Sequence, residues 1–155
     1  MKKLLALIFA GFVALLSTGA MAAGVVTDSI DTGAGSSLSV LTFNVTADAA
    51  DGTVPAYTSA NVVDGLVCRV IVDPDDTAVP TDNYDLTLKD KWGIDVMEGL
   101  LTDCDTTATV AVDYVPTVNS GAAVGCVLVR GPLTLGMSGN SVNSAKTVVR
   151  VLILR

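Results

Sequence analysis

Apolar and polar residues alternate along most of this chain. The clearest example lies in Pro80 to Leu101, where Tyr84, Leu86 and Leu88 alternate with polar residues after a turn-forming Pro-Thr-Asp-Asn segment. A loop of hairpin length then ends at Gly93, and a second, shorter alternation follows. A period of two is typical of half-buried strands. The stretch therefore predicts a β-hairpin with Tyr84, Leu86 and Leu88 in the core.

The same alternation recurs in short segments separated by turn residues. Longer segments span Ser37 to Asp48 and Asn61 to Asp73, and shorter ones span 109–115, 125–130 and 133–137. The last segment, Lys146 to Leu154, is apolar on both faces, which indicates a central or doubly covered strand. Seven to nine short antiparallel strands predict an all-β fold, a single-domain β-sandwich of jelly-roll or immunoglobulin type.

The first 22 residues follow a different pattern. Two lysines precede an apolar run from Leu4 to Leu16, and Ala20-Met21-Ala22 fits a cleavage site. This predicts a signal helix over 1–22, with a retained anchor as the alternative and no membrane span after signal removal. Residues 23–37 are rich in Gly, Ser, Asp and Thr and predict a flexible leader, which leaves 38–155 as the β-sandwich domain.

Composition narrows the range of functions. Valine, threonine and alanine dominate, in keeping with strands. Removal of Lys2 and Lys3 with the signal leaves seven basic residues against 16 acidic ones, a net charge near −9. Because nucleic acid is bound through Lys and Arg, we expect no nucleic-acid partner. The chain has no histidine, and Glu98 is its one glutamate. We therefore expect no catalytic residues, no cofactor and no enzyme.

Aspartates suggest calcium as a further candidate ligand. Asp73, Asp75 and Asp76 form a cluster, and Asp82 and Asp85 follow closely. Oxygen ligands from loops suit calcium, but no D-x-[DN]-x-[DN]-G loop with a following glutamate is present. We interpret these residues as polar turn formers, and we expect no metal site.

The chain contains Cys68, Cys104 and Cys126. Export would permit one disulfide, and an odd count leaves one cysteine outside it. Three pairings are open, and the sequence does not choose among them. Three buried thiols that act as small apolar side chains are the alternative.

Three residues are candidates for contact with a partner: Trp92, Leu152 and Leu154. For Trp92, packing against the core edge is favoured over stacking on a sugar or anchoring a partner, because no other aromatic residues cluster near it. The two leucines need cover, either by a loop of the same domain or by a neighbouring subunit. The second option predicts self-association. Arg69 and Arg130 lie within apolar strands and would face solvent or pair with an acid across a subunit boundary.

The segments 80–88, 93–96 and 131–135 together resemble a known group of proteins. They carry PTDNYDLTL, GIDV and GPLTL, respectively, and the loop ADAADGTVP at 47–55 also fits. The chain is similar over these segments to short, uncharacterised β-rich proteins encoded in the structural gene clusters of tailed bacteriophages and prophages. The resemblance implies a virion-associated or particle-surface component without a cofactor. Those relatives lack a signal peptide, so this chain departs from their pattern.

The sequence thus predicts a non-enzymatic structural or interaction protein. We expect a β-sandwich subunit of a phage-like particle or an extracellular assembly, exported to the periplasm, the exterior or a particle surface. The alternative is a secreted module that binds a glycan or another surface ligand through its sandwich.

Overall fold

The computed structural model describes residues 23–33, 35–104, 112–115, 117–118 and 123–155. Within these ranges the chain is all-β, and every strand pair is antiparallel. The predicted signal helix over 1–22 and the start of the strand predicted over 109–115 lie outside the described residues. None of the described residues forms a helix that could span a membrane.

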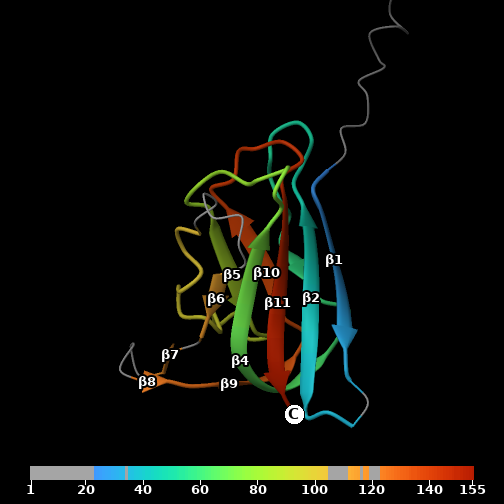
Figure 1. Cartoon of the computed structure of the whole chain (residues 1–155), viewed down its shortest axis with the longest axis vertical. Coiled ribbons are helices and arrows are strands. Elements are labelled where there is room, and N and C mark those ends of the chain that lie inside the picture. Colours follow the sequence, from blue (N-terminus) through green and yellow to red (C-terminus); the bar gives the residue numbers. More distant parts are fainter. Residues whose placement is uncertain (1–22, 34, 105–111, 116, 119–122) are drawn as a thin grey trace, which may run out of the picture.

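The larger sheet has six strands, and β11 lies at its centre (Figure 1). In spatial order they are β1 (Val25–Asp31), β2 (Leu38–Thr46), β11 (Lys146–Leu154), β4 (Val63–Pro74) and β6 (Val112–Tyr114), with β9 (Val127–Gly131) also paired to β4. Strand β4 is long enough to pair with β9 along its first part and with β6 along its second. The expectation that 146–154 is a central strand is confirmed.

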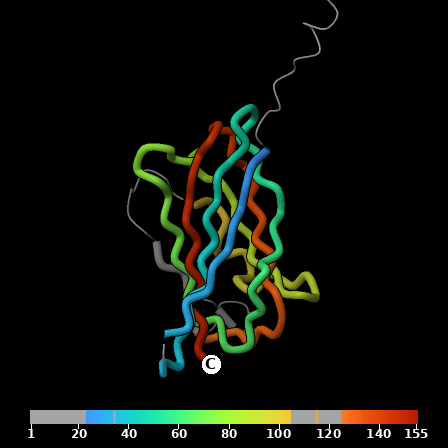
Figure 2. Tube along the Cα trace, turned by 90° about the vertical axis from the view of Figure 1, so that its right-hand side faces the viewer, coloured from blue at the N-terminus to red at the C-terminus, as the bar shows by residue number. Residues whose placement is uncertain are grey.

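A second sheet consists of β3 (Tyr57–Thr58), β10 (Thr134–Ser138) and β5 (Asp85–Lys89). Figure 2 shows this sheet as a separate layer beside the six-stranded one. The strands β9 and β10 follow each other in the chain but belong to different sheets, because the chain changes layer after Gly131. Two short strands, β7 (Thr117–Val118) and β8 (Ala123–Val124), form a third pair.

The two larger sheets share one hydrophobic core. Leu41 and Phe43 of the six-stranded sheet are fully buried, and so are Leu86 and Leu88 of the three-stranded sheet. The Phe43 ring also meets Tyr57 of β3 edge to face, with ring centroids 6.4 Å apart. Burial of each such side chain contributes about 1.5–3 kcal/mol to the free energy of unfolding. The prediction that Tyr84, Leu86 and Leu88 lie in the core is confirmed.

The predicted flexible leader is wrong for Val25–Asp31, which forms β1 and pairs with β2 along its whole length. Val26 is buried and Ile30 packs against the core, while the residues between them are more exposed. This alternation is obscured in the sequence by the Gly- and Ser-rich residues that follow. The leader therefore does not precede the sheet but supplies its edge strand.

The predicted second arm of the hairpin is also not a strand. Beyond the turn at Gly93, the chain contacts this edge of β5 through two isolated bridges, Asp95 to Lys89 and Cys104 to Tyr84, and the strand that pairs with β5 is β10. The Asp95 carboxylate accepts hydrogen bonds from the backbone N–H groups of Met97 (3.2 Å) and Gly99 (2.8 Å). Such local side-chain bonds compete with strand pairing, so the chain turns after Asp95.

Candidate interaction surface

One face of the six-stranded sheet is turned away from the three-stranded sheet, and we call it the outer face. Along β11, Thr147, Val149, Val151 and Ile153 are buried, the residues between them are half-buried, and Lys146 and Leu154 at the two ends are exposed. The strand therefore alternates in burial even though both of its faces are apolar near its end. The described residues do not cover the outer face as they cover the inner one.

Four leucines lie side by side across the outer face, and we call them the leucine row. Leu154 of β11 pairs with Leu38 of β2 and with Leu66 of β4, and Leu66 pairs with Leu128 of β9. Leu38, Leu154 and Leu128 are 42%, 44% and 58% exposed, and Leu66 is half-buried. Directly opposed residues on neighbouring strands point to the same side of a sheet. The register therefore gathers the four side chains into one apolar patch.

A second row lies next to the leucine row on the outer face, and we call it the mixed row. Val40 of β2 pairs with Leu152 of β11, and both side chains are half-buried. Val40 also pairs with Asp31 of β1, and Leu152 pairs with Arg69 of β4. Asp31 and Arg69 are exposed. The row thus runs acid, apolar, apolar, base across four neighbouring strands.

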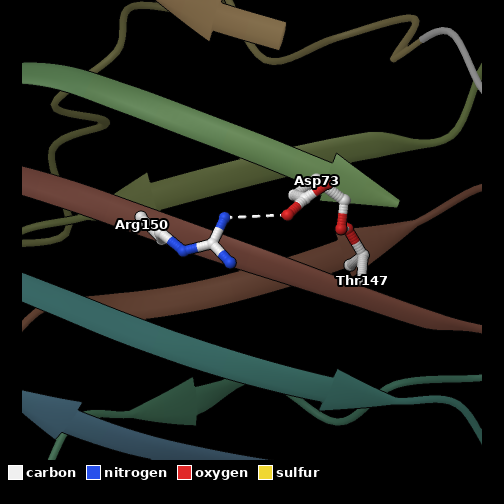
Figure 3. A network of polar contacts seen from close by, with 3 residues as sticks. All are labelled: Asp73, Thr147 and Arg150. Carbon is white, nitrogen blue, oxygen red and sulfur yellow. Dashed lines mark hydrogen bonds and ion pairs between the residues drawn. The ribbon is translucent and has the colours of Figure 1, made fainter. Parts of the chain in front are cut away.

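The other end of the outer face is polar. Arg150 of β11 donates from Nη1 to Oδ2 of Asp73 on β4 at 2.8 Å (Figure 3). Thr147 reaches the same residue, because its hydroxyl donates to the Asp73 backbone carbonyl at 3.3 Å. The Arg150 and Asp73 side chains are 38% and 34% exposed, so water screens the pair and its contribution to stability is below about 1 kcal/mol.

A hollow of about 440 Å³ lies at this polar end, and Asp73, Asp75, Asp76 and Lys146 are among its lining residues. Asp75 is occupied by its own turn, because Thr77 donates to it from both its hydroxyl (2.8 Å) and its backbone N–H (2.9 Å). These bonds lower the pKa of Asp75. Within the described ranges, no group of three or more His, Cys, Asp or Glu residues is placed to hold a metal ion.

Trp92 lies elsewhere, in the turn after β5. Its side chain is 64% exposed, and the neighbouring Ile94 is exposed to the same extent. The favoured interpretation that Trp92 packs against the core edge is therefore wrong. The Asp90 carboxylate holds the turn by accepting backbone N–H bonds from both residues at 2.9 Å, so the two side chains project from it. The ammonium of Lys91 lies 4.4 Å from the centroid of the indole ring.

The cysteines divide into one pair and one buried residue. Cys68 of β4 and Cys126 form a disulfide, one of the three pairings that the sequence left open. Cys104 is 1% exposed, and its thiol donates to the backbone carbonyl of Leu101 at 3.3 Å. The disulfide lies where β4 bulges, because Leu152 pairs with Arg69 while the next residue of β11 pairs with Val67.

Asp28 is a residue that the sequence did not single out. Its carboxylate accepts hydrogen bonds from the Tyr57 hydroxyl (2.6 Å), from the Asn61 side-chain amide (2.7 Å) and from the backbone N–H groups of Ala60 and Asn61 (both 3.1 Å). Partial burial opposes the charged form, but these bonds outweigh it and lower the pKa of Asp28 to about 2. Asp28 thereby ties the edge strand β1 to the segment that begins at β3.

The structure brings together some of the predicted contact residues and separates others. Leu152 and Leu154 both lie on the outer face of β11, whereas Trp92 lies in the turn after β5. Sequence reasoning missed Leu38, Leu66 and Leu128. Each occurs in a segment that was predicted as a strand, but strand order and register place them beside Leu154, and neither can be obtained from periodicity alone.

Comparisons with known proteins give one distant structural neighbour. No protein-family model matches the chain, and no curated protein is similar to it. Among solved structures, a chain of the cyanophage Pam1 capsid asymmetric unit is similar over 88% of this chain and 86% of its own length, with 18% sequence identity and a TM-score of 0.39. At this level of similarity the neighbour assigns neither a fold family nor a function to the chain.

Proposed function

We propose that this chain is a non-enzymatic structural protein, a β-sandwich subunit that self-associates in a phage-like particle or an extracellular assembly. The observation that carries the proposal is the leucine row, in which three of four side chains are more than 40% exposed on one sheet face. Soluble monomers rarely leave such a contiguous apolar patch in water. An exposed patch of this kind is typical of proteins that function through contacts with other molecules.

Other features support this role. The two-layer arrangement and the shared core favour a sandwich, and the phage-protein resemblance of the turn segments favours a particle component. The disulfide between Cys68 and Cys126 favours an oxidising location, which agrees with export by the predicted signal peptide. We expect no catalytic step and no cofactor in this role.

The mass of the purified protein in solution tests the proposal. Light scattering coupled to size-exclusion chromatography should give a multiple of the chain mass at roughly 100 μM, because burial of the leucine row favours association. A folded monomer at that concentration would contradict the proposal. Replacement of Leu128 by serine should weaken association without lowering the free energy of unfolding of the monomer, since Leu128 is 58% exposed.

The alternative, a secreted module that binds a glycan or surface ligand, is favoured by one specific observation. Trp92 and Ile94 are both 64% exposed in one turn, and an exposed indole can stack on a sugar ring. Titration of a glycan library against the intrinsic fluorescence of Trp92, the one tryptophan in the chain, would detect this binding. A monomer with a saturable response would favour the alternative, and Trp92→Ala should abolish that response.

A further inference from the structure

The turn after β5 presents a short apolar tip to solvent, and we call residues 89–94 the tryptophan tip. Residues 91–94 are exposed without interruption, and among them the side chains of Trp92 and Ile94 are each 64% exposed. Figure 2 shows this turn projecting from the body of the molecule. A single exposed apolar residue is ordinary on a soluble protein, but here an indole and a branched aliphatic side chain lie two positions apart in one turn.

Hydrogen bonds fix the backbone of the tryptophan tip. The Asp90 carboxylate accepts N–H bonds from Trp92 and Ile94 at 2.9 Å. The backbone N–H of Asp90 donates to the Ile94 carbonyl at 2.9 Å, and that of Gly93 donates to the Asp90 carbonyl at 3.0 Å. Gly93 has a φ of 82°, which glycine adopts without steric cost. Because the tip is already ordered, a partner that binds it loses little free energy to ordering the turn.

Lys91 holds the indole ring and occupies one of its faces. A Cβ added at Gly131 of β9 would lie 3.0–3.5 Å from three carbons of the Lys91 side chain, so the stem of Lys91 lies against Gly131. The ammonium group lies 4.4 Å from the centroid of the Trp92 ring, where the π electrons attract it. The indole therefore keeps its opposite face for a partner and has a positive charge beside it.

The charges of the tryptophan tip differ from those of the rest of the chain. Beyond residue 22 the chain has 7 basic and 16 acidic residues, yet Lys89 and Lys91 are two of its three lysines there. Asp90 and the following Asp95 balance them, and both carboxylates accept backbone N–H bonds of the turn. The tip is thus neutral overall and combines apolar side chains with two cations.

This combination suits the interface of a phospholipid bilayer better than a sugar. Tryptophan is enriched at the headgroup level of membranes, because its ring is apolar and its N–H is polar. Lysine side chains near such an interface extend towards the phosphates. A sugar site needs hydrogen-bond donors and acceptors for the hydroxyl groups. The exposed neighbours of Trp92 are Lys91, Gly93 and Ile94, whose side chains supply donors but no acceptor.

We infer that the tryptophan tip is a membrane-docking element, which inserts Trp92 and Ile94 into the headgroup region of a phospholipid bilayer. The inference goes beyond the proposed structural role. The tip follows β5 of the three-stranded sheet and the leucine row lies on the six-stranded sheet, so docking leaves that row available for self-association. One tip buries little apolar area, so a single chain should bind weakly, and an assembly that presents several tips should bind more tightly.

The fluorescence of Trp92 tests the inference, because Trp92 is the one tryptophan in the chain. The sample is about 1 μM protein, purified after export, with vesicles of phosphatidylcholine at about 5 mM lipid. The emission should shift to shorter wavelength, and phosphatidylcholine with brominated acyl chains should quench it. Ile94→Ser should weaken partitioning into the vesicles roughly three- to tenfold, because it removes apolar surface that the bilayer would bury. The absence of both the shift and the quenching overturns the inference.

Leu128→Ser provides the matched control. It makes the same kind of change in the leucine row, at a side chain that is 58% exposed. Its partitioning should stay within about twofold of the wild type, since the tip is unchanged and about 1 μM protein is well below the concentration used to detect association. Circular dichroism checks that each variant is folded. Equal weakening by Leu128→Ser, or no weakening by Ile94→Ser, would assign vesicle binding to another surface and overturn the inference.

These outcomes are separate from those for self-association. A protein that associates but leaves the vesicles unbound overturns membrane docking and leaves the proposed function standing. A folded monomer that binds vesicles through the tip supports docking and contradicts self-association. A fluorescence response to a soluble sugar, together with no response to vesicles, would overturn docking and favour the glycan-binding alternative.

Discussion

The two faces of the central strands carry similar apolar residues in different surroundings. On the inner face, Leu41 of β2 and Val151 of β11 are fully buried against the three-stranded sheet. On the outer face of the same strands, Leu38 and Leu154 are 42% and 44% exposed. The difference shows that apolar character alone does not determine burial within one chain. A second layer covers the inner face, whereas no second layer formed by the described residues covers the outer one.

A matched pair of leucine truncations should give the largest contrast between the faces. Leu41→Ala removes a fully buried side chain and should lower the free energy of unfolding by about 2–5 kcal/mol, because it leaves a cavity in the core. Urea unfolding of the monomer measures this loss. A loss below about 0.5 kcal/mol, typical of a surface site, would contradict the assignment of Leu41 to the inner face.

Removal of the hydrogen bonds to Asp28 should have an intermediate effect on the free energy of unfolding. Asp28→Ala removes the acceptor of four hydrogen bonds from the Tyr57–Asn61 segment and should lower the free energy of unfolding by about 1–3 kcal/mol. Hydrogen exchange should report faster opening of β1, the edge strand that holds Asp28. Equal protection of β1 in the variant and the wild type would show that strand pairing with β2 alone holds the edge.

The hydrogen bonds to Asp28 should also make the stability of the protein depend on pH in the acid range. The pKa of Asp28 falls from 3.8 to about 2 on folding, so its contribution to stability is present above about pH 4 and is lost as the pH falls towards 2. Unfolding midpoints in urea, measured at about pH 6 and about pH 2.5, should therefore fall less in Asp28→Asn than in the wild type. The same fall in both proteins would mean that other carboxylates determine the acid sensitivity.

The outer face should give the smallest change in monomer stability. Leu154→Ala truncates a side chain that is 44% exposed and should change the free energy of unfolding of the monomer by less than about 0.5 kcal/mol. Its effect should appear in the strength of self-association instead. A loss of monomer stability comparable to that of Leu41→Ala would remove the distinction between the two faces.

The period-two pattern predicted the strands and the inner core well. Leu86 and Leu88 are buried as expected, and the long strands at Leu38–Thr46 and Val63–Pro74 lie within a few residues of their predicted bounds. These predictions depend on local alternation, which a single sequence displays. They also identified Leu152 and Leu154 as residues on the face opposite the core.

The features that the sequence pattern did not predict depend on how strands that are distant in the chain come together. The leucine row needs β11 to lie between β2 and β4, and the pairing of Asp31, Val40, Leu152 and Arg69 needs their register, which the sequence does not display. The exposure of Trp92 depends on the bonds from Asp90 that shape its turn. Local patterns therefore singled out only part of the candidate surface, namely Leu152, Leu154 and Arg69, and the tertiary structure was needed to add the other residues and bring them together.

The disulfide between Cys68 and Cys126 has a further consequence for any cut in the chain. The two cysteines are 58 residues apart in the sequence. A protease that cleaves once between them produces two fragments that the disulfide still joins. Such a nicked protein would keep its mass apart from one added water, and it would separate on a denaturing gel only after reduction. Loss of a peptide bond in this region would therefore remain hidden until the protein meets a reductant.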